Sequence, residues 1–260
     1  MSVQAQARGV NWLAAVCIHA DRLLKHRLRS PAAVASAVGM PIIMIVMTLV
    51  IFDGMVEQFT GSGMNVGALA VMVAFSSSFT AALMGAGDTV HERHQGLPDR
   101  LATMPGHVSS GYIGRVVSEV VRAEVSVVTA MVVGLIAGAD FGSAVNFWSI
   151  LGIMTVVAIT AGAVGVMLGY VAETPQGAVS FAPLVMAAMF FNTAMMPRDM
   201  YAEVLRPVVD GSPITAITQL VSDIRGDGIE AEHLVLFLVW FGGLLLLSIV
   251  VLSAKARSRR

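Results

Sequence analysis

The sequence predicts an all-α membrane protein with six transmembrane helices. Of its 260 residues, 56% are hydrophobic and only 13% are charged, whereas a soluble domain carries about 25% charged residues. Apolar stretches of about 20 residues, the length that crosses a bilayer as a helix, recur along the chain. Most of the Lys and Arg residues fall in segments that six spans place on the same side of the membrane, as the positive-inside rule requires.

Residues 1–31 are predicted to form a cytoplasmic segment that contains an amphipathic helix from Asn11 to Arg29. Apolar residues recur in it every three or four positions, and its basic residues fall mostly on the other face. Such a helix suits the plane of an anionic membrane surface. The alternative is a helix that packs on a soluble core.

The transmembrane domain is predicted to cover residues 32–254. Its six spans are Ala32–Phe52, Met64–Ala86, Tyr112–Gly138, Ala144–Val171, Gly177–Met196 and His233–Ala254. Two Gly-x-x-x-Gly patterns, Gly134 with Gly138 and Gly165 with Gly169, predict close helix packing.

The third predicted span carries four charges in its first half: Arg115, Glu119, Arg122 and Glu124. Glu119 and Arg122 are three residues apart, so they share a helix face and can pair. We favour the interpretation that this half lies at the cytoplasmic interface. The alternative is a functional group of charges inside the membrane.

An even number of spans places both termini on the same side. The N-terminal segment, the polar segment 88–111 and the basic tail 255–260 hold most of the Lys and Arg residues. These three segments are therefore predicted to be cytoplasmic.

The outer segment 198–231 is predicted to be a re-entrant helical hairpin between spans five and six. Tyr201–Val209 and Pro213–Ile224 are each compatible with a helix, and Ser212-Pro213 is typical of a helix start. Re-entrant backbone must be buried in protein or lie beside water. A plain extracellular loop is the alternative.

Catalytic and metal-binding patterns are missing from the sequence. The two lysines, Lys25 and Lys255, do not follow a glycine-rich phosphate loop, so the chain is not itself an ATPase of that class. His91 and His94 are three residues apart, whereas a zinc-protease motif needs four. The single cysteine, Cys17, excludes a disulfide within the chain. We expect no enzyme activity, no metal and no cofactor bound by this chain, and we expect no nucleic-acid partner.

One interpretation of the hydroxyl groups in the middle of span two is that they line a substrate path. Its candidate residues are Ser76, Ser77, Thr80, Met189 and Asn192. The alternative is that the hydroxyls bond to carbonyls of their own helix and that the methionines fill the core.

The polar segment resembles the cytoplasmic segment of ABC-2 type permeases, in their daunorubicin-resistance branch. The resemblance rests on Glu92-Arg93, Gly96, Arg100-Leu101 and Pro105, followed by Gly114-Arg115. It extends to Asn192, Leu205-Arg206-Pro207 and Ser212-Pro213-Ile-Thr215, where the family commonly has Asn-Pro-x-Thr. The order and spacing of these motifs cover nearly the whole chain.

The resemblance implies the membrane subunit of an exporter of amphipathic drugs, lipids or glycolipids in a bacterial cell membrane. Two permease chains, identical or related, would pair with two cytosolic ATPases that hold ATP and Mg²⁺. Glu92, Arg93, Gly96, Arg100, Leu101 and Pro105 would dock on the ATPase as a coupling helix. The alternatives are a membrane-embedded enzyme and a proton-coupled secondary transporter.

Overall fold

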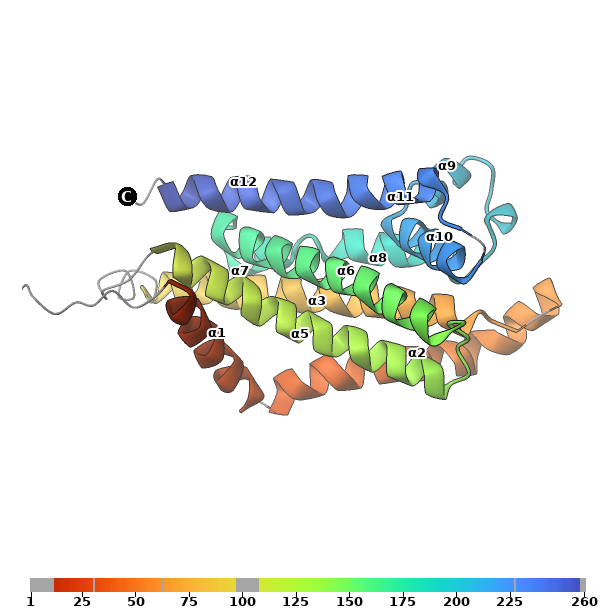
Figure 1. Ribbon diagram of the computed structural model, residues 1–260, viewed down its shortest axis with the longest axis horizontal. Helices are drawn as coiled ribbons and strands as arrows, with labels where there is room; N and C mark the ends of the chain where they lie inside the picture. The colour runs from red at the N-terminus through yellow and green to blue at the C-terminus, as the bar shows by residue number, and fades with distance from the viewer. Residues whose placement is uncertain (1–11, 30, 62, 97–107, 227, 258–260) are drawn as a thin grey trace, which may run out of the picture.

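The computed structural model describes residues 12–29, 31–61, 63–96, 108–226 and 228–257, and every regular element in these residues is helical. Long helices run side by side along the molecule, and α1 crosses them obliquely at one end (Figure 1). The elements are α1 (Trp12–Leu28), α2 (Pro31–Thr60), α3 (Val66–His94), α5 (Val108–Ile136), α6 (Ala144–Val171), α7 (Pro175–Val179), α8 (Ala182–Phe190), η1 (Arg198–Met200), α9 (Arg206–Asp210), α10 (Pro213–Arg225), α11 (Ala231–Phe237), η2 (Leu238–Gly242) and α12 (Gly243–Arg257).

Helix α3 is the centre of the bundle. It is apolar around most of its circumference, as a helix buried on all sides should be, and most of its side chains are buried. It packs against α5, α6, α7 and α2. The main core includes Leu69 and Met72 of α3, Met131 of α5 and Met154 of α6.

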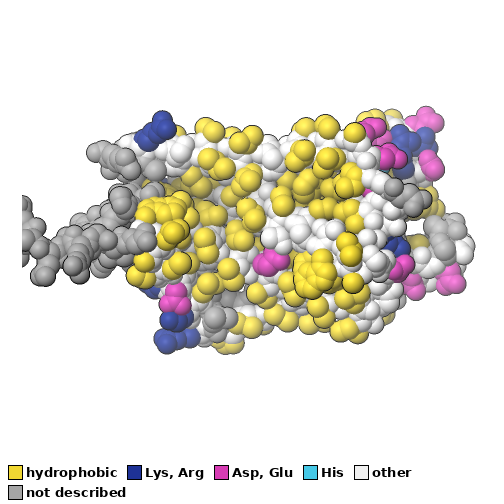
Figure 2. Space-filling view, viewed as in Figure 1, with side chains coloured by type: hydrophobic (Ala, Val, Ile, Leu, Met, Phe, Trp, Pro, Cys, Tyr) yellow, Lys and Arg dark blue, Asp and Glu magenta, His cyan; other side chains and the backbone are white. Residues whose placement is uncertain are grey.

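Within the described residues, four helices are long and apolar enough to cross a membrane: Val34–Gln58, Val66–His94, Ala144–Val171 and Ala231–Lys255. They correspond to predicted spans one, two, four and six. Helix α5 has 29 residues, which is ample length, but its four charges set it apart from these spans. Figure 2 shows why the bundle suits a bilayer, since apolar side chains cover the middle of this face and charges gather mainly at the two ends.

The fifth predicted span, Gly177–Met196, is interrupted. The structure has two short helices here, α7 and α8, separated at Ser180 and Phe181. The physical reason is Pro183, because its ring would clash with the carbonyl of Val179 in a continuous helix. After α8 the chain leaves helical geometry and reaches Asn192.

Proline also interrupts the hydrogen bonds of α2, but here the helix continues. Pro41 lies inside α2 and has no N–H to donate to the carbonyl of Ala37. Ser126 of α5 donates its hydroxyl to that carbonyl at 3.1 Å. A neighbouring helix thus supplies the missing donor, which is how proline is tolerated in helices that lie in lipid.

The end of the bundle that carries α9, α10 and α11 is built from short helices. Helix α10 begins at Pro213, directly after Ser212, which confirms the predicted helix start. The helix predicted for Tyr201–Val209 is shorter in the structure, where α9 begins only at Arg206 and is preceded by η1 and a turn. Helix α10 buries Ile214, Ile217 and Leu220, and it packs on α11, α3 and α6.

Helix α1 lies against α5 through a close backbone crossing. A Cβ placed on Gly114 would lie 2.6 Å from the Cβ of His19 and 3.0 Å from the carbonyl oxygen of Val16. Val16 and Ala20 are buried in this contact, whereas Leu13 is 61% exposed. The apolar stripe predicted for the first helix is therefore only partly covered.

Candidate functional site

The last turns of α3, the first half of α5 and the end of α6 form a cluster of buried charges. Arg115 of α5 is buried, and its guanidinium pairs with the Glu92 carboxylate of α3. The same guanidinium donates a hydrogen bond of 2.6 Å to the Thr89 hydroxyl. Arg115 therefore joins α5 to α3 at two points one helical turn apart.

Arg93 joins α3 to the end of α6. Its Nη1 atom donates to the carbonyl oxygens of Gly169 and Ala172, at 2.9 and 3.0 Å. The last carbonyls of a helix have no partner in their own helix and carry the negative end of its dipole, so a cation is favoured there. The guanidinium also lies 5.9 Å from the ring centroid of Tyr170, and that ring contacts Tyr112 of α5, with centroids 4.5 Å apart.

Deeper in the bundle, Glu119 and Arg122 pair at 3.7 Å, which confirms the pair predicted from their spacing. Glu119 is only 3% exposed, and its carboxylate occupies the space beside Gly85, where a Cβ would lie 2.5 Å away. Arg115 and Glu119 are therefore buried within the bundle. Both are enclosed by α3 and α5. The position of this half of α5 at the cytoplasmic interface stays a prediction.

Glu124 also has a partner within the chain. Its Oε1 atom accepts a hydrogen bond of 3.0 Å from Thr155 of α6, and its Oε2 atom is buried without a hydrogen-bond partner among the described residues. Glu124 lies near the middle of α5, so it stands at the depth of the bilayer centre if α5 crosses the membrane.

The residues predicted to dock on an ATPase fall into two groups. Glu92 and Arg93 point into the bundle and hold helices together, as described above. Gly96 follows the end of α3 with a φ of +68°, a conformation that favours glycine. Arg100, Leu101 and Pro105 lie outside the described residues.

The exposed side chains at this end of α3 are different ones. His91, His94 and Gln95 are exposed, and the side chains of Gln95 and His91 are hydrogen-bonded at 2.8 Å. The sequence predicts no metal-binding or catalytic role for either histidine. The helix period offered a signal, because His91 and Gln95 are one turn apart and Glu92 falls on a different face.

The predicted path residues are mostly buried between helices. Ser76 is 1% exposed and donates to the carbonyl of Met72 at 2.8 Å, in agreement with the alternative that it bonds to its own helix. Ser77 is buried, and Thr80 and Met189 are partly buried. None of these four residues lines the groove between α5, α6 and α12 that is described below.

Asn192 forms the break after α8. It is fully buried, and its amide nitrogen donates to the carbonyls of Ala188 and Met189, at 3.0 and 2.6 Å. Its amide oxygen accepts from the backbone N–H of Ala194 at 2.8 Å. The side chain thus satisfies backbone groups that the end of the helix leaves unpaired.

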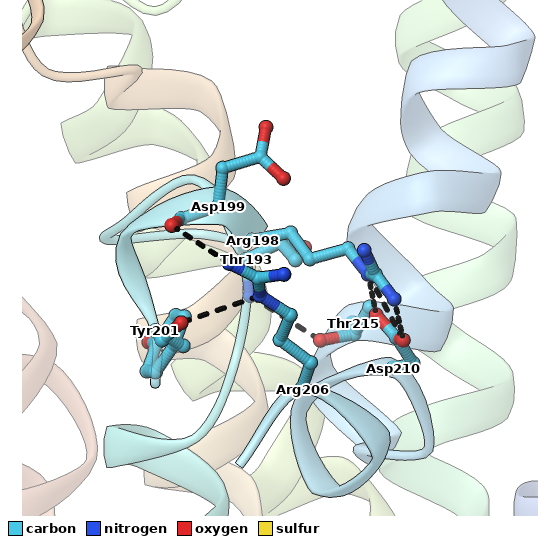
Figure 3. A network of polar contacts seen from close by, with 7 residues as sticks. All are labelled: Thr193, Arg198, Asp199, Tyr201, Arg206, Asp210 and Thr215. Atoms are coloured by element: carbon cyan, nitrogen blue, oxygen red, sulfur yellow. Dashed lines mark hydrogen bonds and ion pairs between the residues drawn. The ribbon is translucent and has the colours of Figure 1, made fainter. Parts of the chain in front are cut away.

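A polar network holds the turn that follows (Figure 3). Arg198 donates to both carboxylate oxygens of Asp210, at 2.7 to 2.9 Å. Arg206 donates to the carbonyl of Tyr201 at 3.3 Å, and the Tyr201 hydroxyl donates to the carbonyls of Phe190 and Asn192. Burial raises the pKa of the Tyr201 hydroxyl still further above neutral pH, where a tyrosine is protonated and can donate in any case.

We expect the contact between Arg198 and Asp210 to persist at neutral pH and to be lost only in acid. The hydrogen bond from Arg198 holds the pKa of the Asp210 carboxyl below its usual range. Because the native pKa is the lower one, the contact contributes fully above the unfolded value of about 3.9 and is lost as the pH falls through the native value. Hydrogen exchange of residues 198–210, corrected for intrinsic rates, should show protection that falls in this range. The Asp210→Asn variant should lack this acid-dependent step, and an unchanged acid response in that variant would exclude the carboxyl as its cause.

The chain is similar in sequence to known membrane transport proteins. Residues 14–224 match the family model described as "ABC-2 type transporter". Over 251 residues the chain is 26% identical to a "Probable doxorubicin resistance ABC transporter permease protein DrrC" of Mycobacterium tuberculosis, strain CDC 1551 / Oshkosh. The alignment covers 95% of this chain and 89% of that protein. The protein of the same description from strain ATCC 25618 / H37Rv matches with the same identity and coverage.

Proposed function

The chain belongs to the ABC-2 type transporter family, and we propose that it is the membrane-spanning subunit of an ATP-driven exporter in a bacterial cell membrane. Two such subunits, identical or related, would pair with two cytosolic ATPases that bind ATP and Mg²⁺. We propose an amphipathic drug, lipid or glycolipid as the substrate. The names of the related proteins, which refer to doxorubicin resistance, support a substrate of this kind.

The proposed topology has six crossings, formed by α2, α3, α5, α6, the pair α7 and α8, and α11 with η2 and α12. Helix α5 can cross because its buried charges have partners, as charges inside a membrane require. Arg115 pairs with Glu92 of α3, and Glu119 pairs with Arg122 of α5 itself. Both termini and the end of α3 would be cytoplasmic. The short helices α9 and α10 would lie at the outer surface as a re-entrant hairpin, and the burial of Ile214 and Leu220 supports this.

The observation that carries the proposal is the anchoring of the end of α3. Glu92 binds Arg115 of α5, and Arg93 binds the end of α6. An ATPase that pressed on residues 91–105 would therefore move three helices together. In this arrangement Glu92 and Arg93 transmit force within the permease. The contact with the ATPase would be made by exposed neighbours such as His94 and Gln95, together with Gly96, Arg100, Leu101 and Pro105.

Disulfide crosslinking to the purified partner ATPase tests this assignment. The exposed Cys17 is first changed to Ser, and a single cysteine is then introduced by Gln95→Cys or Leu101→Cys. The matched control is Ala137→Cys, because Ala137 is exposed, as Gln95 is, and lies just beyond the opposite end of α5. We expect crosslinks to cysteines in the ATPase cleft from both test positions and none from the control.

Crosslinking that is equal at all three positions, or absent from both test positions in a complex that still co-purifies, would exclude docking at residues 91–105. Transport and ATP hydrolysis by the uncrosslinked complex provide the functional reference. We expect the crosslinked complex to hydrolyse ATP more slowly than the reduced complex, because the ATPase can no longer move freely against the permease.

A further inference from the structure

A groove of about 450 Å³ opens between α5, α6 and α12, and none of its residues belongs to the predicted substrate path. Ile113 and Val116 of α5, Ile159 and Ala163 of α6, and Leu245 and Ile249 of α12 form much of its apolar lining. The lining also contains Arg257, near the end of α12. The groove thus has an apolar body and a cationic end.

The groove has the depth of one membrane leaflet. Leu245 and Arg257 are twelve residues apart on α12, which corresponds to about 18 Å along a helix. Half of the bilayer hydrocarbon core is about 15 Å thick. Arg257 would therefore lie at the headgroups when Leu245 lies near the middle of the bilayer.

The position of the groove's other end, the one farthest from Arg257, is consistent with a depth of one leaflet. Thr155 lies on the same face of α6 as Ile159 and Ala163, one turn farther along. Its hydroxyl donates to Glu124 near the middle of α5. The apolar lining therefore stops at about the depth where the mid-helix polar pair begins, and it does not continue into the opposite leaflet.

We propose that this groove binds an anionic phospholipid of the cytoplasmic leaflet, with one acyl chain along α12 and the phosphate at Arg257. Charge complementarity selects this occupant, because basic sites between helices at the cytoplasmic side attract anionic headgroups. A long Arg side chain can also extend its guanidinium to the headgroup level while its stem covers apolar surface. The proposal depends on the proposed function only for which end of the bundle is cytoplasmic.

The site contacts the charge cluster through one aromatic pair. Tyr112 lines the groove and packs on Tyr170, and Arg93 lies over the Tyr170 ring. A bound acyl chain would thus support the aromatic pair on which the Arg93 contact rests.

Native mass spectrometry of the purified permease, titrated with phosphatidylglycerol or with phosphatidylcholine of the same acyl chains, tests the site. Ile249→Trp fills the groove, and Val250→Trp is its control, because Val250 is 62% exposed and does not line the groove. Arg257→Gln removes the cation, and Arg225→Gln removes one at the opposite end of the bundle.

We expect Ile249→Trp to lose the retained lipid. We expect Arg257→Gln to bind phosphatidylglycerol about fivefold more weakly, since one basic residue near an anionic surface contributes roughly that factor. Both controls should bind as the parent does.

Three outcomes would overturn the proposal. Equal retention of the two lipids by the parent would exclude selection for an anionic headgroup. Unchanged binding in Ile249→Trp and in Ile113→Trp, which fills the same groove from α5, would exclude the groove as the site. Loss of a dimer in these two variants, without loss of lipid, would assign the groove to a second copy of the chain. None of these measurements involves the ATPase or transport, so they can fail while the exporter assignment stands.

Discussion

Replacing Arg115 with methionine is expected to destabilise the permease by about 3 kcal/mol, the lower end of the range for breaking a buried ion pair. The substitution keeps much of the side-chain volume but leaves the Glu92 carboxylate without its cation and the Thr89 hydroxyl without its donor. The lower end applies because the Glu92 side chain is still 26% exposed and can recruit water. Unfolding of the purified protein in a lipid nanodisc, followed by helicity against denaturant, measures the loss.

A double-mutant cycle separates the pair from the rest of the site. Glu92→Gln alone should also destabilise, because it leaves the Arg115 guanidinium buried against a neutral amide. The combination of Glu92→Gln with Arg115→Met should recover much of the loss, since an uncharged pair leaves no uncompensated charge. Additive effects in the double variant would mean that the two charges do not stabilise the fold through each other.

The same cycle also tests the route of force. If the pair transmits movement from the end of α3 to α5, the double variant should fold but should couple ATP hydrolysis to export less well. The matched comparison is the pair Arg198→Gln with Asp210→Asn, which removes an exposed ion pair at the other end of the bundle. Equal coupling in the two double variants would place the route elsewhere.

Long uncharged apolar stretches were sufficient to predict α2, α3, α6 and the α11–α12 region, because a helix in lipid must be apolar along its whole length. The start of α10 was also predictable, since Ser212-Pro213 is a local signal. The Glu119–Arg122 pair followed from its spacing on one helix. Each of these features depends on residues that are close together in the sequence.

The roles of Glu92, Arg93 and Arg115 could not be predicted in this way. Glu92 and Arg115 are 23 positions apart, and Arg93 binds carbonyls 76 and 79 positions away. A polar segment between two apolar ones looks solvated unless the packing of three helices is known. Pro183 is a sequence signal for the break in the fifth span. The span was predicted as continuous because Gly177–Met196 is apolar over the length of a whole crossing.

Replacing Gly165 with valine is expected to have the other large effect, because α3 and α6 cross at this residue. A Cβ on Gly165 would lie 2.6 Å from the carbonyl oxygen of Ala82 and 2.9 Å from its Cβ. One of these neighbours is backbone, so the helices must move apart. Overpacking of a core costs about 1–3 kcal/mol, and this site is at the upper end because α3 is the buried centre of the bundle.

Gly152→Val is the matched control, since Gly152 lies in the same helix and a Cβ there meets nothing within 4 Å. Both variants change helix propensity by the same amount, so the difference between them isolates the close approach. Unfolding in nanodiscs should place Gly165→Val well below Gly152→Val in stability, with Gly165→Ala between them. If the two valine variants have the same free energy of unfolding, the close contact between α3 and α6 at Gly165 does not stabilise the fold. That result would also contradict the packing described for the charge cluster. Gly169, one turn along α6, packs on Thr89 in the same crossing and supplies a carbonyl to Arg93.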